Sequence, residues 1–332
     1  MRATVEHPYA EFIQQVGKPA RYLGGERNQI VKDWDGARTR LCLAFPDLYD
    51  IGMSHLGTKI LYKVVNEHPD LLVERAFAPW ADMEAQLRSR ELPVLSLESA
   101  RPLADFDVVG FSLQYELTYT NVLLLLDLSG IPLRAADRRE EDPLIVAGGP
   151  CATHPEPCAP FFDAILIGDA EAELPAALVA LADLREAGAT RSERLRALAR
   201  RGGWYVPELY GVEEEPRTGV QVVVRREGVS EEDAPLPVVR RLVEDISEFP
   251  FPDDSPVAAA EAIFDRMSIE IARGCTEGCR FCQAGMIYRP VRERDPEEIV
   301  DTLVAAVRKG GFDEASLTSL STADYSCINP LI

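Results

Sequence analysis

Ile-Ala-Arg-Gly-Cys-Thr-Glu-Gly-Cys-Arg-Phe-Cys-Gln-Ala-Gly, from Ile271 to Gly285, is the stretch that decides the fold of the second half of this chain. It places Cys275, Cys279 and Cys282 with three and then two residues between them, and glycines lie on both sides. Thiolates at this spacing can bind one face of a cubane iron–sulfur cluster and leave the fourth iron without a protein ligand. The sequence therefore predicts a [4Fe–4S] cluster whose chemistry takes place at the open iron.

Other roles for the three cysteines fit the spacing less well. A structural zinc site needs four ligands, and no second Cys or His pair follows within the next forty residues. A disulfide would leave one of three cysteines unpaired, and a thioredoxin-type pair would stand without the third. The cluster is the interpretation we prefer over these three.

The residues around the cysteines predict a strand, a loop and a helix in that order. Residues 268–272 alternate as a strand, and the cysteine loop follows its carboxyl end, where (β/α) barrels place active-site loops. Asp295 and Pro296 predict the start of a helix that ends at Gly310 and Gly311. Residues 314–320 predict a second strand.

The first 175 residues predict an α/β domain with a Rossmann-like, doubly wound parallel sheet, because apolar strand patterns alternate with helical ones. The expected strands are residues 41–45, 94–97, 108–113, 144–147 and 164–167, and the expected helices include residues 60–65, 81–87 and 118–128. Ligands of such sheets bind beyond the carboxyl ends of the strands. That rule points to the loops at residues 46–57, 114–116, 148–154 and 168–171.

The pattern changes at about residue 176. Residues 176–256 predict a connector with an Ala/Leu/Arg-rich helical stretch, a hairpin at residues 220–224 and a Pro-rich run. We therefore expect three parts, namely residues 1–175, residues 176–256 and residues 257–332.

Composition predicts a cytoplasmic protein that binds neither membranes nor nucleic acid. The 332 residues are 46% hydrophobic and carry a net charge of −20, which repels polyanions. The first residues lack the apolar core of a signal peptide, and no apolar run reaches membrane-spanning length. The remaining cysteines, Cys42, Cys151, Cys158 and Cys327, have no metal-ligand spacing and are expected to be buried.

The cysteine loop, with the aromatic Phe281 before its third cysteine, resembles the radical SAM superfamily. The resemblance implies that Cys275, Cys279 and Cys282 hold a [4Fe–4S] cluster and that S-adenosylmethionine (SAM) binds the fourth iron. An electron from a donor such as flavodoxin or ferredoxin then cleaves SAM to a 5′-deoxyadenosyl radical. Phe281 is expected near the adenine.

The end of the second strand is where this superfamily contacts the methionyl part of SAM. The usual Gly-Gly-Glu type sequence is missing there, so the candidates for this contact are Ser319, Ser321, Thr322 and Asp324. A turn or capping role for Ser321 and Asp324 fits these residues equally well.

Three N-terminal segments, at residues 108–112, 147–156 and 167–171, resemble the cobalamin-binding-like domain that is fused to many radical SAM enzymes. The Asp-x-His-x-x-Gly motif that ligates cobalt is altered here, because Asp50 stands five residues before His55 and Gly57 only two after it. We therefore expect His55 at a helix N-terminus and not as a cobalt ligand. Cobalamin without a histidine ligand remains open.

From Arg21 to Asn329 the sequence resembles the N-terminal half of a functionally uncharacterised radical SAM family. Its hallmarks are the segments at residues 22–26, 45–54 and 110–117 together with the cysteine loop. The resemblance implies a cofactor and a reaction type but no substrate, and it leaves methyl transfer and sulfur insertion (methylthiolation) open. The competing hypothesis is a non-catalytic module that binds metal or a partner through a structural cysteine site.

A radical SAM barrel has about six strand–helix units, whereas the sequence from residue 257 has room for two. Two strands and one helix cannot close a barrel. We expect a fragment of a longer protein that is inactive alone, with an open sheet edge.

Overall fold

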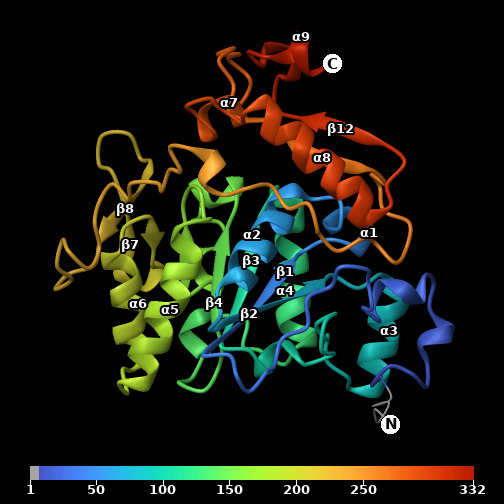
Figure 1. Cartoon of the computed structure of the whole chain (residues 1–332). Helices are drawn as coiled ribbons and strands as arrows, with labels where there is room; N and C mark the ends of the chain where they lie inside the picture. The colour runs from blue at the N-terminus through green and yellow to red at the C-terminus, as the bar shows by residue number, and fades with distance from the viewer. Residues whose placement is uncertain (1–6) are drawn as a thin grey trace.

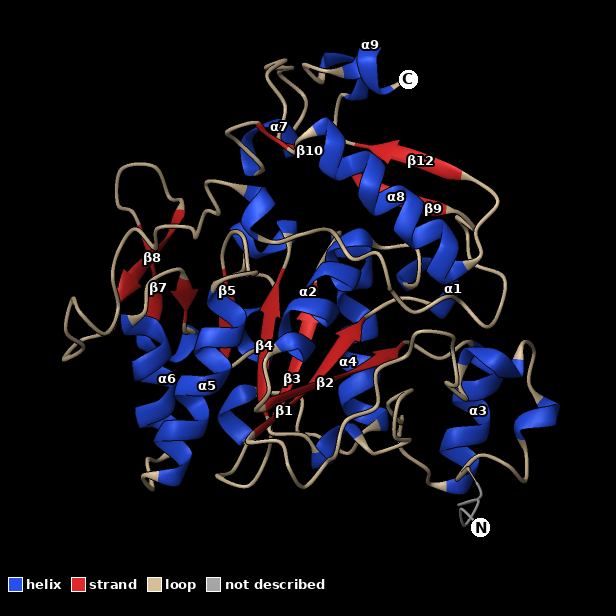
Figure 2. Ribbon diagram, viewed as in Figure 1, coloured by secondary structure: helices blue, strands red, loops and turns tan. Residues whose placement is uncertain are grey.

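A computed structural model describes residues 7–332 and shows an α/β protein built on a mostly parallel six-stranded sheet (Figures 1 and 2). The strands are β1 (Thr39–Phe45), β2 (Leu71–Phe77), β3 (Val108–Ser112), β4 (Leu144–Gly148), β5 (Ala164–Leu166) and β6 (Trp204–Tyr205). Their order is β2-β1-β3-β4-β5-β6, and only β6 runs antiparallel to its neighbour. The predicted fold class is confirmed.

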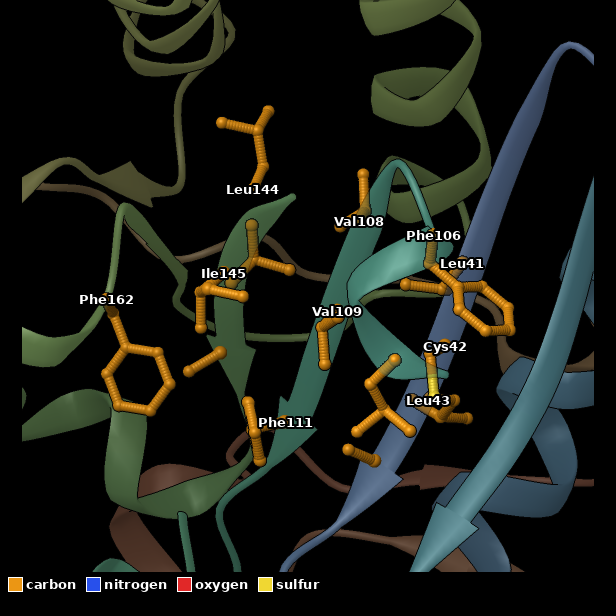
Figure 3. Packing of buried hydrophobic residues seen from close by; sticks show 14 of the residues in the cluster. Leu41, Cys42, Leu43, Phe106, Val108, Val109, Phe111, Leu144, Ile145 and Phe162 are labelled. Carbon is orange, nitrogen blue, oxygen red and sulfur yellow. The ribbon is translucent and has the colours of Figure 1, made fainter. Parts of the chain in front are cut away.

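Apolar side chains on both faces make this sheet the centre of the largest core (Figure 3). Leu41 pairs with Val108, and Val108 pairs with Leu144, so apolar rows cross three neighbouring strands. All three side chains are buried. Burial on both faces explains why β1, β3 and β4 have nearly continuous apolar sequences.

Helices cover both faces of the sheet. They are α1 (Tyr49–Gly52), α2 (Leu56–Glu67), α3 (Ala81–Arg90), α4 (Tyr119–Leu128), α5 (Glu173–Glu186) and α6 (Arg191–Arg200). The chain moves along the sheet in one direction from β1 to β2 and in the other from β3 to β4, so right-handed crossovers place α2 and α4 on opposite faces (Figure 2). Helix α5 lies beside α2.

One of the sequence-based strand assignments is wrong, and one strand of the sheet was missed. The segment 94–97 is not a strand, because Ser96 N donates to Arg101 O and Leu97 N to Arg75 O, which leaves a single bridge at Leu95. The second strand of the sheet is instead β2, which the sequence analysis did not predict. Its central Glu74 and Arg75 interrupt the apolar pattern, although both are buried.

The segment after residue 175 is more closely integrated with the sheet than a connector. Helices α5 and α6 replace the single helical stretch, and β6 adds Trp204 and Tyr205 to the sheet. The predicted hairpin is present as β7 (Tyr210–Glu214) and β8 (Gln221–Arg225). The division of the chain into three parts stays a prediction.

The second half begins with β9 (Met267–Glu270), which pairs in parallel with β12 (Ala315–Thr318). Between them lie β10 (Ala272–Arg273), α7 (Ala284–Ile287), β11 (Arg292–Glu293) and α8 (Pro296–Gly310), and the chain continues to α9 (Ile328–Leu331). Asp295 caps α8 by accepting from the backbone N–H groups of Glu297 and Glu298, as the sequence predicted. Among the described residues, β12 has β9 as its single strand neighbour.

The second half lies over the carboxyl ends of the parallel strands, at the top of Figure 1. Ile60 of α2 joins Phe251, Met267, Ile269 and Ile299 in one buried cluster, so apolar contacts unite the two halves. No helix within residues 7–332 combines the length and the apolar character needed to cross a membrane.

Candidate functional site

The cysteine loop, residues 274–291, follows the carboxyl end of β9 and the short strand β10. Cys279 is exposed, whereas Cys275 and Cys282 are half-buried. All seven cysteines of the chain lie within the described residues and are free. The loop therefore presents three unpaired thiols at the position where the sequence predicted an active-site loop.

Thiols are the donors that iron–sulfur clusters take, so the identity of these side chains fits such a group. Cys275 Sγ accepts a hydrogen bond from Glu277 N at 3.4 Å. Within residues 7–332, no three His, Cys, Asp or Glu side chains converge closely enough to hold a metal ion. The three cysteine sulfurs thus lie on one loop, but they are not arranged around a common metal position.

Gly274 is required where the loop begins. Its φ of +97° is in the left-handed region, and a Cβ there would lie 2.7 Å from both Tyr288 O and Pro290 O. Any other residue would clash with the backbone of the returning strand of the loop. The first and last residues of the loop are consequently held in close contact.

The other predicted site residues lie either at a cavity or on the outer surface of the molecule. Ser319 lines the cavity described below, and its Oγ donates to Thr322 Oγ1 at 3.2 Å. Ser321 Oγ donates to Asp324 Oδ2 at 2.5 Å within a turn on the outside of the molecule. Phe281 is 91% exposed and contacts no core. That Phe281, Ser319, Ser321, Thr322 and Asp324 contact SAM stays a prediction.

A cavity of about 480 Å³ lies between the two halves, beside their apolar contact. One wall consists of the carboxyl ends of β3, β4 and β5 and the start of α2, the loops at which the sequence predicted a ligand site. The opposite wall comes from β9, β10, the start of the cysteine loop and the end of β12. Representative residues are His55, Ser112, Gly149, Asp169, Glu270, Arg273, Gly274, Tyr288 and Ser319.

Apolar side chains and glycines make up most of the cavity wall, and charged groups gather at the end beside the cysteine loop. Arg273 binds Glu270 in a bidentate ion pair with both N–O distances at 2.9 Å, and it binds Glu171 Oε1 at 2.6 Å. Burial disfavours the charged guanidinium, but the two carboxylates outweigh it and raise the pKa of Arg273. Arg273 stays a cation at this wall.

Arg273 was not among the residues predicted from the sequence to be functional. The available signal was its position directly before Gly274 and Cys275, at the end of the predicted strand. Its carboxylate partner Glu171, in contrast, lies in a loop that was expected to bind a ligand. The pairing depends on contacts across the two halves, which local sequence patterns do not encode.

His55 is the N-cap of α2, as the sequence predicted. Its Nδ1 accepts from Thr58 N at 3.1 Å and contacts Thr58 Oγ1 at 2.9 Å. Burial lowers the pKa of His55 to about 4, so the ring is neutral at neutral pH. With Nδ1 accepting, Nε2 carries the proton and cannot coordinate a metal ion in this tautomer.

Two family models match this chain. The model described as "Radical SAM proteins, N-terminal" matches residues 57–207, which contain most of the six-stranded sheet. The model described as "Radical SAM superfamily" matches residues 269–326, which contain the cysteine loop.

The individual proteins that are similar to this chain are about twice as long as it. An uncharacterized protein of Methanocaldococcus jannaschii is 23% identical over 292 residues, covering 87% of this chain and 50% of that protein. The radical S-adenosylmethionine methyltransferase TsrM of Kitasatospora setae, solved with cobalamin and a [4Fe-4S] cluster, matches with a TM-score of 0.47 and 15% identity over 89% of this chain and 51% of TsrM. A second TsrM structure, with tryptophan substrate and a SAM analogue, gives a TM-score of 0.46 and 13% identity over 86% and 48%. The chain spans about half the length of these relatives.

Proposed function

Because this chain belongs to the radical SAM superfamily, we propose that it provides the iron–sulfur and SAM site of an enzyme that cleaves SAM reductively. The observation that carries the proposal is the loop with three free cysteines at the carboxyl end of β9. A [4Fe–4S] cluster, when bound there, supplies the electron that converts SAM to methionine and a 5′-deoxyadenosyl radical.

In this proposal Cys275, Cys279 and Cys282 hold the cluster as thiolates. The cavity beside the loop receives SAM and excludes water, with its mostly apolar wall shielding the reactive centre. Ser319 on the cavity wall offers a hydroxyl to the polar groups of SAM.

The proposed function is tested by anaerobic reconstitution with iron and sulfide. We expect four irons per chain, the broad visible absorbance of an iron–sulfur cluster, and a loss of both in Cys282→Ala. Cys327→Ala is the matched control, since Cys327 is also half-buried but lies outside the loop. Stoichiometric zinc with no iron uptake would instead support a structural metal site in a non-catalytic module. Turnover of SAM by the reduced protein then reports whether this chain alone has activity.

We further propose that the sheet side of the cavity binds a corrinoid without a histidine ligand, which makes methyl transfer the favoured outcome over methylthiolation. The supporting observations are that Gly148, Gly149 and Gly168 line the cavity at the strand ends, and that the neutral His55 caps α2 beside them.

Titration with hydroxocobalamin tests this second step. Saturable binding is expected, and the visible spectrum of the bound corrinoid should be the same in the wild type and in His55→Asn, because Asn keeps the helix cap. If the spectrum of the bound corrinoid differed between the wild type and His55→Asn, His55 would be a cobalt ligand. An absence of binding would leave the cavity to SAM and substrate.

A further inference from the structure

The two ends of the cysteine loop are joined by a short antiparallel ladder. In this ladder Ala272 pairs with Glu293, and Arg273 pairs directly with Arg292. The three cysteines therefore lie on a closed loop whose base carries two neighbouring guanidinium groups. Such a pair of like charges is stabilised by nearby carboxylates. Arg273 already binds Glu270 and Glu171, and one further carboxylate contacts both arginines.

That carboxylate is Asp169, which directly follows Gly168 at the end of β5. Arg273 Nη1 donates to Asp169 Oδ1 at 3.2 Å, and Arg292 Nη1 donates to Asp169 Oδ2. Arg292 Nη1 also donates to Val243 O at 2.6 Å. One carboxylate of the first half thus holds both ends of the loop that belongs to the second half.

The backbone around Asp169 fixes this carboxylate in place. Asp169 N donates to Arg241 O at 3.0 Å, and Val243 N donates to Asp169 Oδ2 at the same distance. Gly168 has a φ of +106°, and a Cβ there would lie 2.0 Å from Arg241 O, so only glycine allows the connector to approach this closely. Asp169 also lines the cavity, where a ligand can contact it.

We propose that Asp169 is a positioning residue that sets the conformation of the cysteine loop and links it to the contents of the cavity. The inference rests on the proposed function, because it concerns the loop that would hold the cluster. Asp169 contacts no cysteine; it acts through Arg273 and Arg292. A ligand that changes how Asp169 binds these arginines changes the loop, and by linkage the state of the loop changes the affinity of the cavity for that ligand.

The first test uses the chain without cluster and measures hydrogen–deuterium exchange in residues 274–291. Asp169→Asn removes the charge of the shared partner and is expected to speed exchange in this loop by about tenfold, while exchange in β1 and β3 stays unchanged. Asp169→Glu keeps the charge and is expected to recover most of the protection.

Asp233→Asn is the matched control. Asp233 is 9% exposed at its side chain against 11% for Asp169, and it also binds two arginines, Arg196 at 3.1 Å and Arg200 at 2.7 Å. These partners belong to α6, so the control should leave exchange in the cysteine loop unchanged. Equal exchange of the loop in Asp169→Asn and the wild type would overturn the proposal.

If Asp169→Asn fails to fold, Arg292→Gln provides a second variant, because it releases one end of the loop and leaves Asp169 bound to Arg273. If both single variants fold, the double variant Asp169→Asn with Arg292→Gln should speed exchange in the loop by less than the two single effects combined. Residues that act together give such a result. Fully additive effects would contradict a shared role.

The second test uses the reconstituted protein and the electron paramagnetic resonance spectrum of the reduced cluster. Asp169→Asn is expected to take up iron but to give a broadened or altered signal, with a weaker response to added SAM than Asp233→Asn. An unaltered signal and SAM response would overturn the link to the cluster. A wild type that takes up no iron would refute the proposed function, while the exchange experiment would still decide whether Asp169 positions the loop.

Discussion

At the scale of single residues, His55 shows how one side chain can be assigned from sequence and then explained by structure. The spacing of Asp50, His55 and Gly57 departs from a cobalt-binding loop, and the structure places His55 at the N-cap of α2. The hydrogen bond from Thr58 N to His55 Nδ1 then fixes the tautomer. A sequence pattern can predict such a cap, but not the protonation state that follows from burial.

The depressed pKa of His55 gives a prediction for the pH dependence of stability. The folded-state pKa is about 4 and the unfolded value is about 6.5, so the unfolded chain binds the proton more tightly. The free energy of unfolding should be highest above pH 6.5 and fall as the pH drops from 6.5 to 4, by on the order of 3 kcal/mol. His55→Asn retains a cap without titrating in this range. Urea denaturation at pH 7 and pH 4.5 should therefore show a smaller loss for His55→Asn than for the wild type, and equal losses would contradict the assignment.

At the scale of secondary-structure elements, local sequence signals predicted those elements whose ends and faces they encode. Helix α8 begins at the predicted Asp295–Pro296 start and ends at Gly310 with Gly311 at φ +78°. Strand β2 was missed, because Glu74 and Arg75 look like surface residues in the sequence. Glu74 accepts from the Ser96 and Ser99 hydroxyls, and Arg75 binds Glu26 and Glu98. Partners so distant in sequence cannot be read from a local pattern.

The cap of α8 leads to a prediction on the helix that follows the cysteine loop. Asp295→Ala should cost about 1 kcal/mol, because two backbone N–H groups lose their acceptor. Hydrogen–deuterium exchange in residues 296–300 should rise accordingly. Asp301→Ala, an exposed position on the same helix, should leave this exchange unchanged. Similar effects of both variants would show that helix propensity and not the cap is responsible.

At the scale of the whole molecule, the sequence predicted the strand-end loops that line the cavity, but not how the second half of the chain packs against the sheet. The contact combines the apolar cluster around Ile60 with the ion pairs of Asp169. Ile60 looks like any residue on the apolar face of α2. The face of α2 that turns toward the second half cannot be distinguished in sequence from the face that covers the sheet.

Paired truncations on α2 should separate these two faces. Ile60→Ala removes buried contacts with the second half and should cost about 2–4 kcal/mol, with faster exchange in β9. Val65→Ala removes buried contacts on the sheet side of the same helix and should loosen β1 and β2 instead. Hydrogen–deuterium exchange measured for each strand distinguishes the two variants. If both variants speed exchange in the six-stranded sheet alone, the placement of Ile60 against the second half is refuted.

The contrast between buried and accessible cysteines also governs how the chain tolerates oxygen. Burial raises the pKa of the Cys158 thiol to about 11 and raises that of Cys42 as well, so few reactive thiolates form at these sites. In the cysteine loop, Cys279 is exposed and Cys275 and Cys282 are half-buried, so oxidants can reach these thiols. In air, sulfenic acids and loop disulfides should therefore accumulate in the cysteine loop before the buried thiols of Cys42, Cys151 and Cys158 are oxidised. Damage by oxygen would then remove the ligands of the loop while the sheet beneath it stays folded.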